Sequence, residues 1–418
     1  MTGRQLFSIM GEVEDSMIQE AETYRILKGS RKKKIMGKAL IGDVYKRQEQ
    51  CSSHYCFPNR LEDMEVLQEA VRTGGKWAGY YLGELLYDRG RWEEAVELWE
   101  ACCCEISLPT VWRNLALAYY NKRKDGSRAR EAMERAFSMD PTDARVFYEL
   151  DQLYKVLNLP YENRLAQMEA HQELLAGRDD LYTEYVTLLN LDGQYQKALA
   201  AMEQHRFHPW EGGEGKITAQ YRIARVGLAK EVFAEKPETA EAHLQAALCY
   251  PENLGEGKLA GAEDQDIDYL LGCLRQGKAG EDALRRAARG PGEISAAVYY
   301  NDQPPEMLYY SGLALGKLGR EREASECFRR LREFGLAHEK DEIKIDYFAV
   351  SLPDFLIFEG DRRRKNRVDC CFLTALGYLG ESNWEEAARY AEKGLEEDQS
   401  HFGLRQVRKA AEQCRSWI

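Results

Sequence analysis

Residues 112–136 read WRNLALAYYNKRKDGSRAREAMERA and predict two helices joined by a short turn. Apolar residues recur at helical spacing in both halves, and a polar turn separates the halves at about residues 124–127. The second half carries Ala129, Met133 and Ala136 at intervals of four and three residues. Small residues at this spacing let two helices approach closely, and the larger residue between them fills the remaining space. The stretch therefore predicts an antiparallel helix pair.

The triplet of the second helix recurs along the chain. The other copies are Ala95–Trp99–Cys102, Ala198–Met202–His205, Ala240–Leu244–Ala247, Ala324–Phe328–Leu331 and Ala387–Ala391–Gly394. A recurring unit of this kind indicates a solenoid, in which each unit buries its apolar face against its neighbours. We therefore expect an all-α fold and a repeat array over residues 49–418.

The repeats resemble the tetratricopeptide family, whose unit of about 34 residues pairs a Trp-x2-Leu-Gly-x2-Tyr helix with an Ala-x3-Phe helix and a stop proline. The unit that begins at Trp112 carries Leu115, Tyr119 and Ala129, and ends at Pro141. The resemblance implies a right-handed superhelical solenoid with about eight helix pairs between Leu61 and the C-terminus. Two stretches depart from the pattern, since residues 147–167 lack the alanine and residues 267–290 are interrupted by glycines.

Two loops carry a second resemblance. Residues 207–216 (FHPWEGGEGK) and 250–258 (YPENLGEGK), together with residues 55–60 (YCFPNR), look like segments of large bacterial proteins. Those proteins have an N-terminal domain of unknown function followed by a tetratricopeptide array. The resemblance covers about residues 50–418 and implies that this chain is the repeat half.

Residues 43–48 (DVYKRQ) match the translation of a transposon end used in sequencing libraries. We therefore interpret residues 1–48 as a non-native or disordered segment, a suspected library chimera, and exclude it from functional reasoning. The alternative is a natural exposed hexapeptide.

Composition excludes several classes. The net charge of −12 argues against nucleic-acid binding, and the short basic run at residues 362–367 is expected to be solvated. No stretch approaches the ~20 apolar residues of a membrane span. The eleven cysteines lack the spacing of disulfide or zinc motifs, which favours free thiols in the cytoplasm. Cys51, His54 and Cys56 lie close together but no second ligand pair follows, so we expect no metal and no cofactor.

The two loops form the first candidate site. They share Pro-x3-Gly-Glu-Gly-Lys, and Pro209 and Pro251 each follow the repeat alanine by eleven residues. Because equivalent corners of a solenoid stack side by side, the loops should meet and form a polar ligand site with aromatic walls. Alternatively, their Glu and Lys residues form salt bridges that only fix the repeat spacing. The expected ligand-binding residues are His208, Trp210, Glu214, Lys216, Tyr250, Glu256 and Lys258.

The concave surface of the first helices is the second candidate. In register with Trp112, it should present Tyr80, Tyr87, Arg113, Tyr120, Tyr148 and Lys155. Such a polar, aromatic groove suits an extended peptide or a glycan, because Tyr supplies contact area at little entropic cost. The alternative is an ordinary mixed surface.

No catalytic motif of the H-E-x-x-H or G-x-S-x-G type is present. We therefore predict a non-catalytic scaffold that binds a protein or peptide partner in the concave groove. The alternative is the accessory ligand- or glycan-binding half of a carbohydrate-active or other metabolic enzyme whose catalytic domain is missing here. The sequence predicts no oligomeric state.

Overall fold

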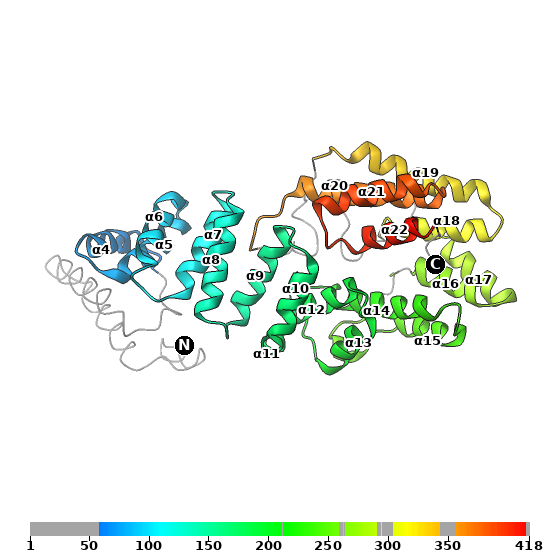
Figure 1. The fold of residues 1–418 in the computed structure, drawn as a ribbon, viewed down its shortest axis with the longest axis horizontal. Helices are drawn as coiled ribbons and strands as arrows, with labels where there is room; N and C mark the ends of the chain where they lie inside the picture. The colour runs from blue at the N-terminus through cyan, green and yellow to red at the C-terminus, as the bar shows by residue number, and fades with distance from the viewer. Residues whose placement is uncertain are drawn as a thin grey trace, which may run out of the picture. The chain divides into compact units, whose positions relative to one another are not determined.

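A computed structural model describes residues 58–210, 212–258, 262, 264–290, 294, 304–342 and 357–414 of the 418-residue chain. Over these residues the chain consists of helices joined by turns and loops, with no strand, so the predicted all-α class is confirmed (Figure 1). Residues 1–48 and the Cys51, His54 and Cys56 group lie outside the described residues. Within the described part of the chain, no helix is long and apolar enough to cross a membrane.

Eight successive helix pairs, α5/α6 to α20/α21, occupy the described part of the chain, in agreement with the predicted number. Helix α4 precedes them, α22 follows them, and the single-turn helix α11 comes after α10. The helices are α4 (Leu61–Arg72), α5 (Lys76–Asp88), α6 (Trp92–Cys102), α7 (Pro109–Asn121), α8 (Gly126–Met139), α9 (Ala144–Val156), α10 (Tyr161–Ala170), α11 (Gln172–Leu175), α12 (Asp179–Leu191), α13 (Tyr195–Gln204), α14 (Lys216–Val232), α15 (Pro237–Ala247), α16 (Gln265–Leu274), α17 (Gly277–Ala287), α18 (Met307–Lys317), α19 (Glu321–His338), α20 (Arg362–Gly380), α21 (Trp384–Glu397) and α22 (Phe402–Glu412).

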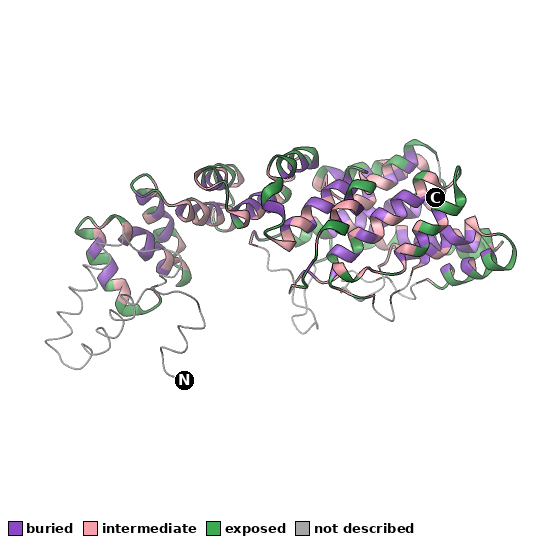
Figure 2. Cartoon of the chain, turned by 90° about the horizontal axis from the view of Figure 1, so that it is seen from below, coloured by how far each residue is buried: buried purple, intermediate pink, exposed green. Residues whose placement is uncertain are grey.

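The repeated alanine is the fourth residue of the second helix in most pairs, and it is buried throughout. Ala95, Ala129, Ala198, Ala240, Ala324 and Ala387 are each at most 4% exposed. Four residues later, side chains such as Trp99 and Phe328 fill the space between the paired helices. A Cβ atom on Gly83 would lie 2.3 Å from Nε1 of Trp99, so the α5/α6 contact requires a glycine there. Buried faces consequently turn towards neighbouring helices (Figure 2).

The helix pairs group into two compact units. Unit 1 ends at Asp140 and contains α4 to α8, whereas unit 2 begins at Pro141 and contains α9 to α22.

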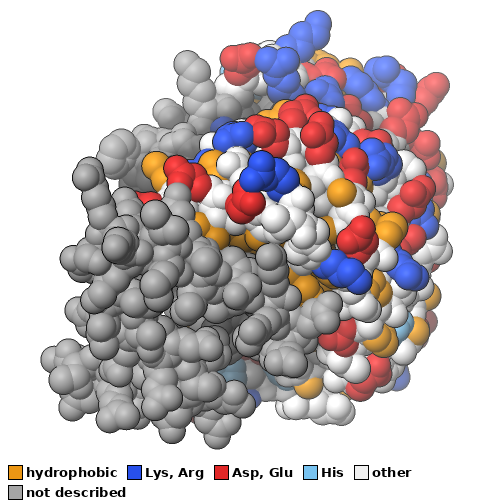
Figure 3. Space-filling view, turned by 90° about the vertical axis from the view of Figure 1, so that its left-hand side faces the viewer, with side chains coloured by type: hydrophobic (Ala, Val, Ile, Leu, Met, Phe, Trp, Pro, Cys, Tyr) orange, Lys and Arg blue, Asp and Glu red, His pale blue; other side chains and the backbone are white. Residues whose placement is uncertain are grey.

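On the face shown in Figure 3, acidic and basic side chains are interspersed over the described surface. Many exposed charges belong to local pairs, such as Arg91 and Glu94 at 2.6 Å.

Both stretches that depart from the repeat pattern nevertheless form helix pairs. In α17, Gly280 takes the position of the repeated alanine, and a Cβ atom there would lie 2.3 Å from the carbonyl oxygen of Arg275. In α10, Arg164 takes that position and is 1% exposed. Its guanidinium donates to both carboxylate oxygens of Asp151 in α9, at 2.9 and 2.8 Å, and to Glu184 in α12 at 3.2 Å. A buried ion pair therefore takes the place of the small residue at this position of the α9/α10 pair.

Unit 2 differs from an open solenoid because its last helices return to its first pair. The side chain of Asn158 donates from Nδ2 to the carbonyl of Glu396 at 3.0 Å and accepts from the N–H of Gln399 at 2.8 Å. Gln399 donates back from Nε2 to the carbonyl of Asn158 at 3.0 Å. Arg405 of α22 donates to the hydroxyl of Tyr161 at 3.1 Å. We call these contacts between residues 156–164 and 396–405 the closing seam.

The basic run at residues 362–367 is a further departure from expectation. It forms the first turns of α20, and part of it belongs to the packed structure. Arg364 donates from Nη1 to the carbonyl of Val156 at 2.9 Å and from Nε to the carbonyl of Glu397 at 2.8 Å. Arg367 forms an ion pair with the Glu397 carboxylate at 2.6 Å. The expectation of a wholly solvated run was wrong because α20 lies against the closing seam.

Candidate ligand site

The two related loops of unit 2 lie against each other. The N–H of Phe207 donates to the carbonyl of Asn253 at 2.8 Å. Asn253 in turn donates from Nδ2 to the carbonyls of Met202 and His205, at 2.7 and 2.9 Å. These bonds tie the end of α13 to the loop that follows α15, so one backbone bond and two bonds from the Asn253 side chain join equivalent corners of successive repeats.

A carboxylate completes the contact between the two loops. The N–H of Gly215 donates to Oε2 of Glu256 at 2.8 Å, directly at the start of α14. Gly215 and Gly255 both have a φ of 75°, which is the left-handed region that favours glycine. A Cβ atom on Gly255 would lie 2.6 Å from the carbonyl oxygen of Phe207, so this close approach excludes a side chain.

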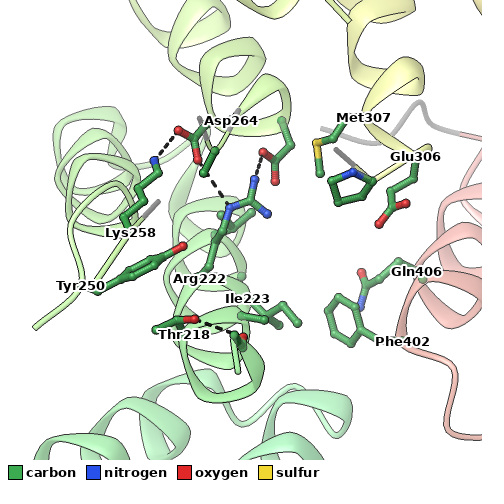
Figure 4. A pocket seen from close by; sticks show the side chains of 18 of the residues that line it. Thr218, Arg222, Ile223, Tyr250, Lys258, Asp264, Glu306, Met307, Phe402 and Gln406 are labelled. Atoms are coloured by element: carbon green, nitrogen blue, oxygen red, sulfur yellow. Dashed lines mark hydrogen bonds and ion pairs between the residues drawn. The ribbon is translucent and has the colours of Figure 1, made fainter. Parts of the chain in front are cut away.

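A cavity of about 800 Å³ opens beside these loops, within unit 2. Helix α14 supplies one wall, and the start of α16, the start of α18, α20 and α22 supply the others (Figure 4). The lining residues with charged or aromatic side chains are Tyr195, Glu214, Arg222, Lys230, Tyr250, Glu256, Lys258, Asp264, Asp266, Glu306, Tyr310, Asp369, Phe372, His401 and Phe402. Its size and mixed lining are those of a small-molecule or side-chain pocket.

Two of the cations in the cavity are held in ion pairs. Arg222 of α14 pairs with Asp266 at the start of α16, and its Nε lies 3.8 Å from Asp264. Lys258 pairs with the other carboxylate oxygen of Asp264 (Figure 4). Asp266 also accepts the N–H of Ile267 at 2.8 Å, which fixes its orientation. This network links the second loop to α14 and α16.

Burial changes the proton affinity of several lining groups. Desolvation raises the pKa of Asp369 to about 6 and also raises the pKa of Glu306 and Glu256. The pKa of Lys230 is lowered to about 8, chiefly by desolvation. Desolvation in the cavity thus disfavours the charged form of these groups, and shifted pKa values of this kind are common at functional sites.

The structure brings four of the seven predicted loop residues to the cavity, namely Glu214, Tyr250, Glu256 and Lys258. The other three lie outside its lining. His208 donates its N–H to Asp179 at 2.8 Å and leaves its ring largely in solvent. The ring of Trp210 packs over Gly213, and Lys216 is exposed at the first position of α14. Ligand binding by these loops stays a prediction.

The residues of the predicted concave groove are divided between the two units. Tyr80, Tyr87, Arg113 and Tyr120 belong to unit 1, whereas Tyr148 and Lys155 belong to unit 2. The assignment of Tyr80 to the groove was wrong, because this side chain is 2% exposed and packs against the ring of Tyr81 at 4.9 Å. Lys155 is exposed but pairs with Glu184 at 2.5 Å. Tyr87, Arg113, Tyr120 and Tyr148 are half-buried, so their role in a groove stays a prediction.

Several lining residues were missed by the sequence analysis. Arg222 and Lys230 lie on one face of α14, where a spacing of eight residues is an available but unspecific signal. Glu306 immediately precedes α18, Asp369 lies in α20, and Phe402 begins α22. Helices α20 and α22 also take part in the closing seam, which no periodic sequence pattern predicts. Among the described residues, no cluster of His, Cys, Asp and Glu has the arrangement of a metal site.

Comparison with known proteins adds little to this description. No family model matches the chain. The structure of Naa15/Naa10 bound to HypK-THB is 12% identical, with a TM-score of 0.38, over 90% of this chain and 60% of that chain. The TPR domain of P58(IPK) is 13% identical, with a TM-score of 0.23, over 84% and 98% of the two chains. The APC/C hetero-tetramer Cut9–Hcn1 is 12% identical, with a TM-score of 0.25, over 94% and 95%. At this similarity the partners of those proteins say nothing about the ligand of this chain.

Proposed function

We propose that this protein is a non-catalytic interaction module of the cytoplasm, and that unit 2 holds part of a peptide partner in its cavity. The observation that carries the proposal is the cavity itself, a hollow of about 800 Å³ in which residues of six helices and both loops converge. A volume of that size accommodates one or two side chains of a bound segment. Ordinary packing between repeats leaves no such space.

The side chains that line the cavity are of the kinds that recognise a bound ligand. Aromatic rings of Tyr250, Tyr310 and Phe402 supply contact area at little entropic cost. Arg222 and Lys258 are already oriented by Asp264 and Asp266, so binding does not have to order them. Preorganised polar groups of this kind give specificity because less conformational entropy is lost on binding.

Arg113 and Tyr120 of unit 1 remain the part of the concave groove that a longer partner would contact. Both lie on α7 and are half-buried. We expect the double variant Arg113→Ala/Tyr120→Ala to weaken binding of long peptides and to leave short peptides unaffected. Equal binding of long peptides to this variant and to wild type would remove unit 1 from the proposal.

Selection from a random decapeptide library on the full chain tests the cavity. Selected peptides should bind Phe402→Ala at least about tenfold more weakly than wild type, because an aromatic contact of the cavity lining is lost. Tyr390→Ala is the matched control, since Tyr390 is a half-buried aromatic residue on α21 that lies outside the cavity lining. Peptides that bind Phe402→Ala as tightly as wild type would show that they sit elsewhere.

The glycan-binding alternative has its own support. Aromatic rings next to carboxylates, as with Tyr250 and Glu256, also suit a sugar ring and its hydroxyl groups. In this case the chain would be the accessory half of a carbohydrate-active or other metabolic enzyme. Binding on a glycan array that Phe402→Ala abolishes, with no peptide selected from the library, would favour this alternative over the peptide module.

A further inference from the structure

We propose that the group held in the unit 2 cavity is an organic cation, an ammonium or guanidinium carried on an alkyl chain. The inference rests on the proposed function and specifies the chemistry of its ligand. A basic side chain of a peptide and a free polyamine are the two sources of such a group.

The charged groups that line the cavity carry an excess of negative charge. Six carboxylates line it, those of Glu214, Glu256, Asp264, Asp266, Glu306 and Asp369, against three cations, Arg222, Lys230 and Lys258. Six minus three leaves an excess of three negative charges with every group ionised and His401 neutral. A binding hollow with this excess attracts a cation and repels an anion.

The protein's own cations pair with only some of the lining carboxylates. Asp264 and Asp266 take up Arg222 and Lys258 in ion pairs. Glu256 accepts the N–H of Gly215. Among the described residues, by contrast, neither Glu306 nor Asp369 forms an ion pair. Glu306 and Asp369 therefore lack the ion pairs that Asp264 and Asp266 form.

The carboxylates of Glu306 and Asp369 reach the cavity from different elements. Glu306 immediately precedes α18, and Asp369 lies on α20. Both carboxylates line the same cavity. Desolvation chiefly raises the pKa of Glu306, the positive charge of Arg222 lowers it, and the negative charge of Asp369 raises it further. Figure 4 shows Glu306 across the open space from Arg222 and Ile223, with Phe402 nearby. A cation between them would relieve their repulsion.

Aromatic and apolar side chains form the remaining walls of the cavity. Rings of Tyr310, Phe372 and Phe402 belong to the same lining. An ammonium or guanidinium group gains from an aromatic face in addition to a carboxylate, whereas a neutral or anionic group of the same shape does not. Apolar residues such as Ile223, Val226 and Met307 suit the alkyl chain that carries the charge.

Matched probes test the charge of the ligand. The probes are N-acetyl-Gly-Lys-Gly-amide, the same peptide with norleucine or glutamate in place of lysine, and cadaverine as a free amine. Calorimetry and ligand-observed NMR on the full chain should show binding of the lysine peptide at least about tenfold tighter than the norleucine peptide, and weakest binding of the glutamate peptide. Tighter binding of the lysine peptide than of cadaverine would assign the cation to a peptide, and the reverse to a polyamine.

Isosteric variants locate the site. Glu306→Gln/Asp369→Asn should remove most of the preference for lysine over norleucine, and Asp369→Asn alone should weaken it by about fivefold. Glu385→Gln, which changes an exposed carboxylate at the start of α21, is the matched control and should bind as wild type.

Two results would overturn the inference. Norleucine or glutamate peptides that bind as tightly as the lysine peptide would contradict it and leave the proposed function standing if binding still depends on Phe402. A lysine preference that persists in Glu306→Gln/Asp369→Asn would place the cation elsewhere. Failure of every probe and of every library peptide to bind would contradict the proposed function itself.

Discussion

Arg164 and Asp151 form two parallel hydrogen bonds inside the α9/α10 pair, at 2.9 and 2.8 Å, at the position where the other pairs carry a small residue. Arg164 is also within 3.5 Å of Ser400 in the turn before α22. An arginine in place of alanine thus couples a weakly packed repeat to the returning C-terminal segment. That segment in turn carries Phe402 to the cavity.

Arg164→Ala should destabilise unit 2 by about 3–5 kcal/mol, because it leaves the buried carboxylate of Asp151 without its ion pair and leaves Glu184 paired with Lys155 alone. Urea unfolding with hydrogen exchange of α9 and α10 measures the effect. Arg130→Ala, which removes an exposed pair with Glu134, is the control and should cost less than about 0.5 kcal/mol. Equal, small effects of the two variants would contradict this account of the α9/α10 pair.

Asn158→Ala should open the closing seam. It removes two side-chain hydrogen bonds to residues 396 and 399, and it strains a backbone whose φ is 57°, so we expect a loss of about 2 kcal/mol. Hydrogen exchange in α22 should accelerate. Asn163→Ala, at an exposed position on α10, should leave exchange unchanged. Unchanged protection of α22 in Asn158→Ala would show that other contacts hold the seam.

Gly255→Ala and Gly257→Ala test the contact between the two loops. The first substitution places a Cβ atom 2.6 Å from the carbonyl oxygen of Phe207 at a φ of 75°, and should cost about 2 kcal/mol. The second adds a Cβ atom that meets nothing within 4 Å and should be nearly neutral. Thermal unfolding measures both changes. Identical melting of the two variants would mean that the loops do not need their close contact.

Asp369→Asn should stabilise the protein in a pH-dependent way. The folded-state pKa of about 6 lies above that of an unfolded Asp, so the folded state binds the proton more tightly. Stability is therefore lost as pH rises from about 4 through 6, and the asparagine variant escapes this loss. Because Asp369 is partly exposed, we expect a gain of about 1–2 kcal/mol at pH 7.5 and none at pH 4. Urea unfolding at both pH values measures the free energy of unfolding. A gain that is the same at pH 4 and pH 7.5 would contradict the prediction.

Local sequence patterns predict much of this fold. The alanine at the fourth position of the second helices identifies most pairs, because close helix contact requires a small residue there. The missing alanine at Arg164 marks the irregular α9/α10 pair, but its ion pairs depend on Asp151 and Glu184, whose spacing carries no signal. The meeting of the two loops follows from the repeat register, with Gly215 and Glu256 in contact.

Long-range closure was not predictable in the same way. Asn158 and Gln399 are 241 residues apart, and a single polar pair at that separation leaves no periodic pattern. The cavity depends on this closure, so Glu306 and Phe402 were missed. The assignment of Tyr80 to the groove failed for a related reason. The repeat register predicts the helix face on which a residue lies, but it does not predict which neighbouring side chains cover that face.

A crystal structure of the full chain with a library-selected lysine-containing peptide shows directly where the ligand binds. We expect the peptide's basic side chain in the unit 2 cavity, between the carboxylates of Glu306 and Asp369 and beside Phe402. A peptide seated on α5 and α7 of unit 1, with the cavity empty, would contradict it.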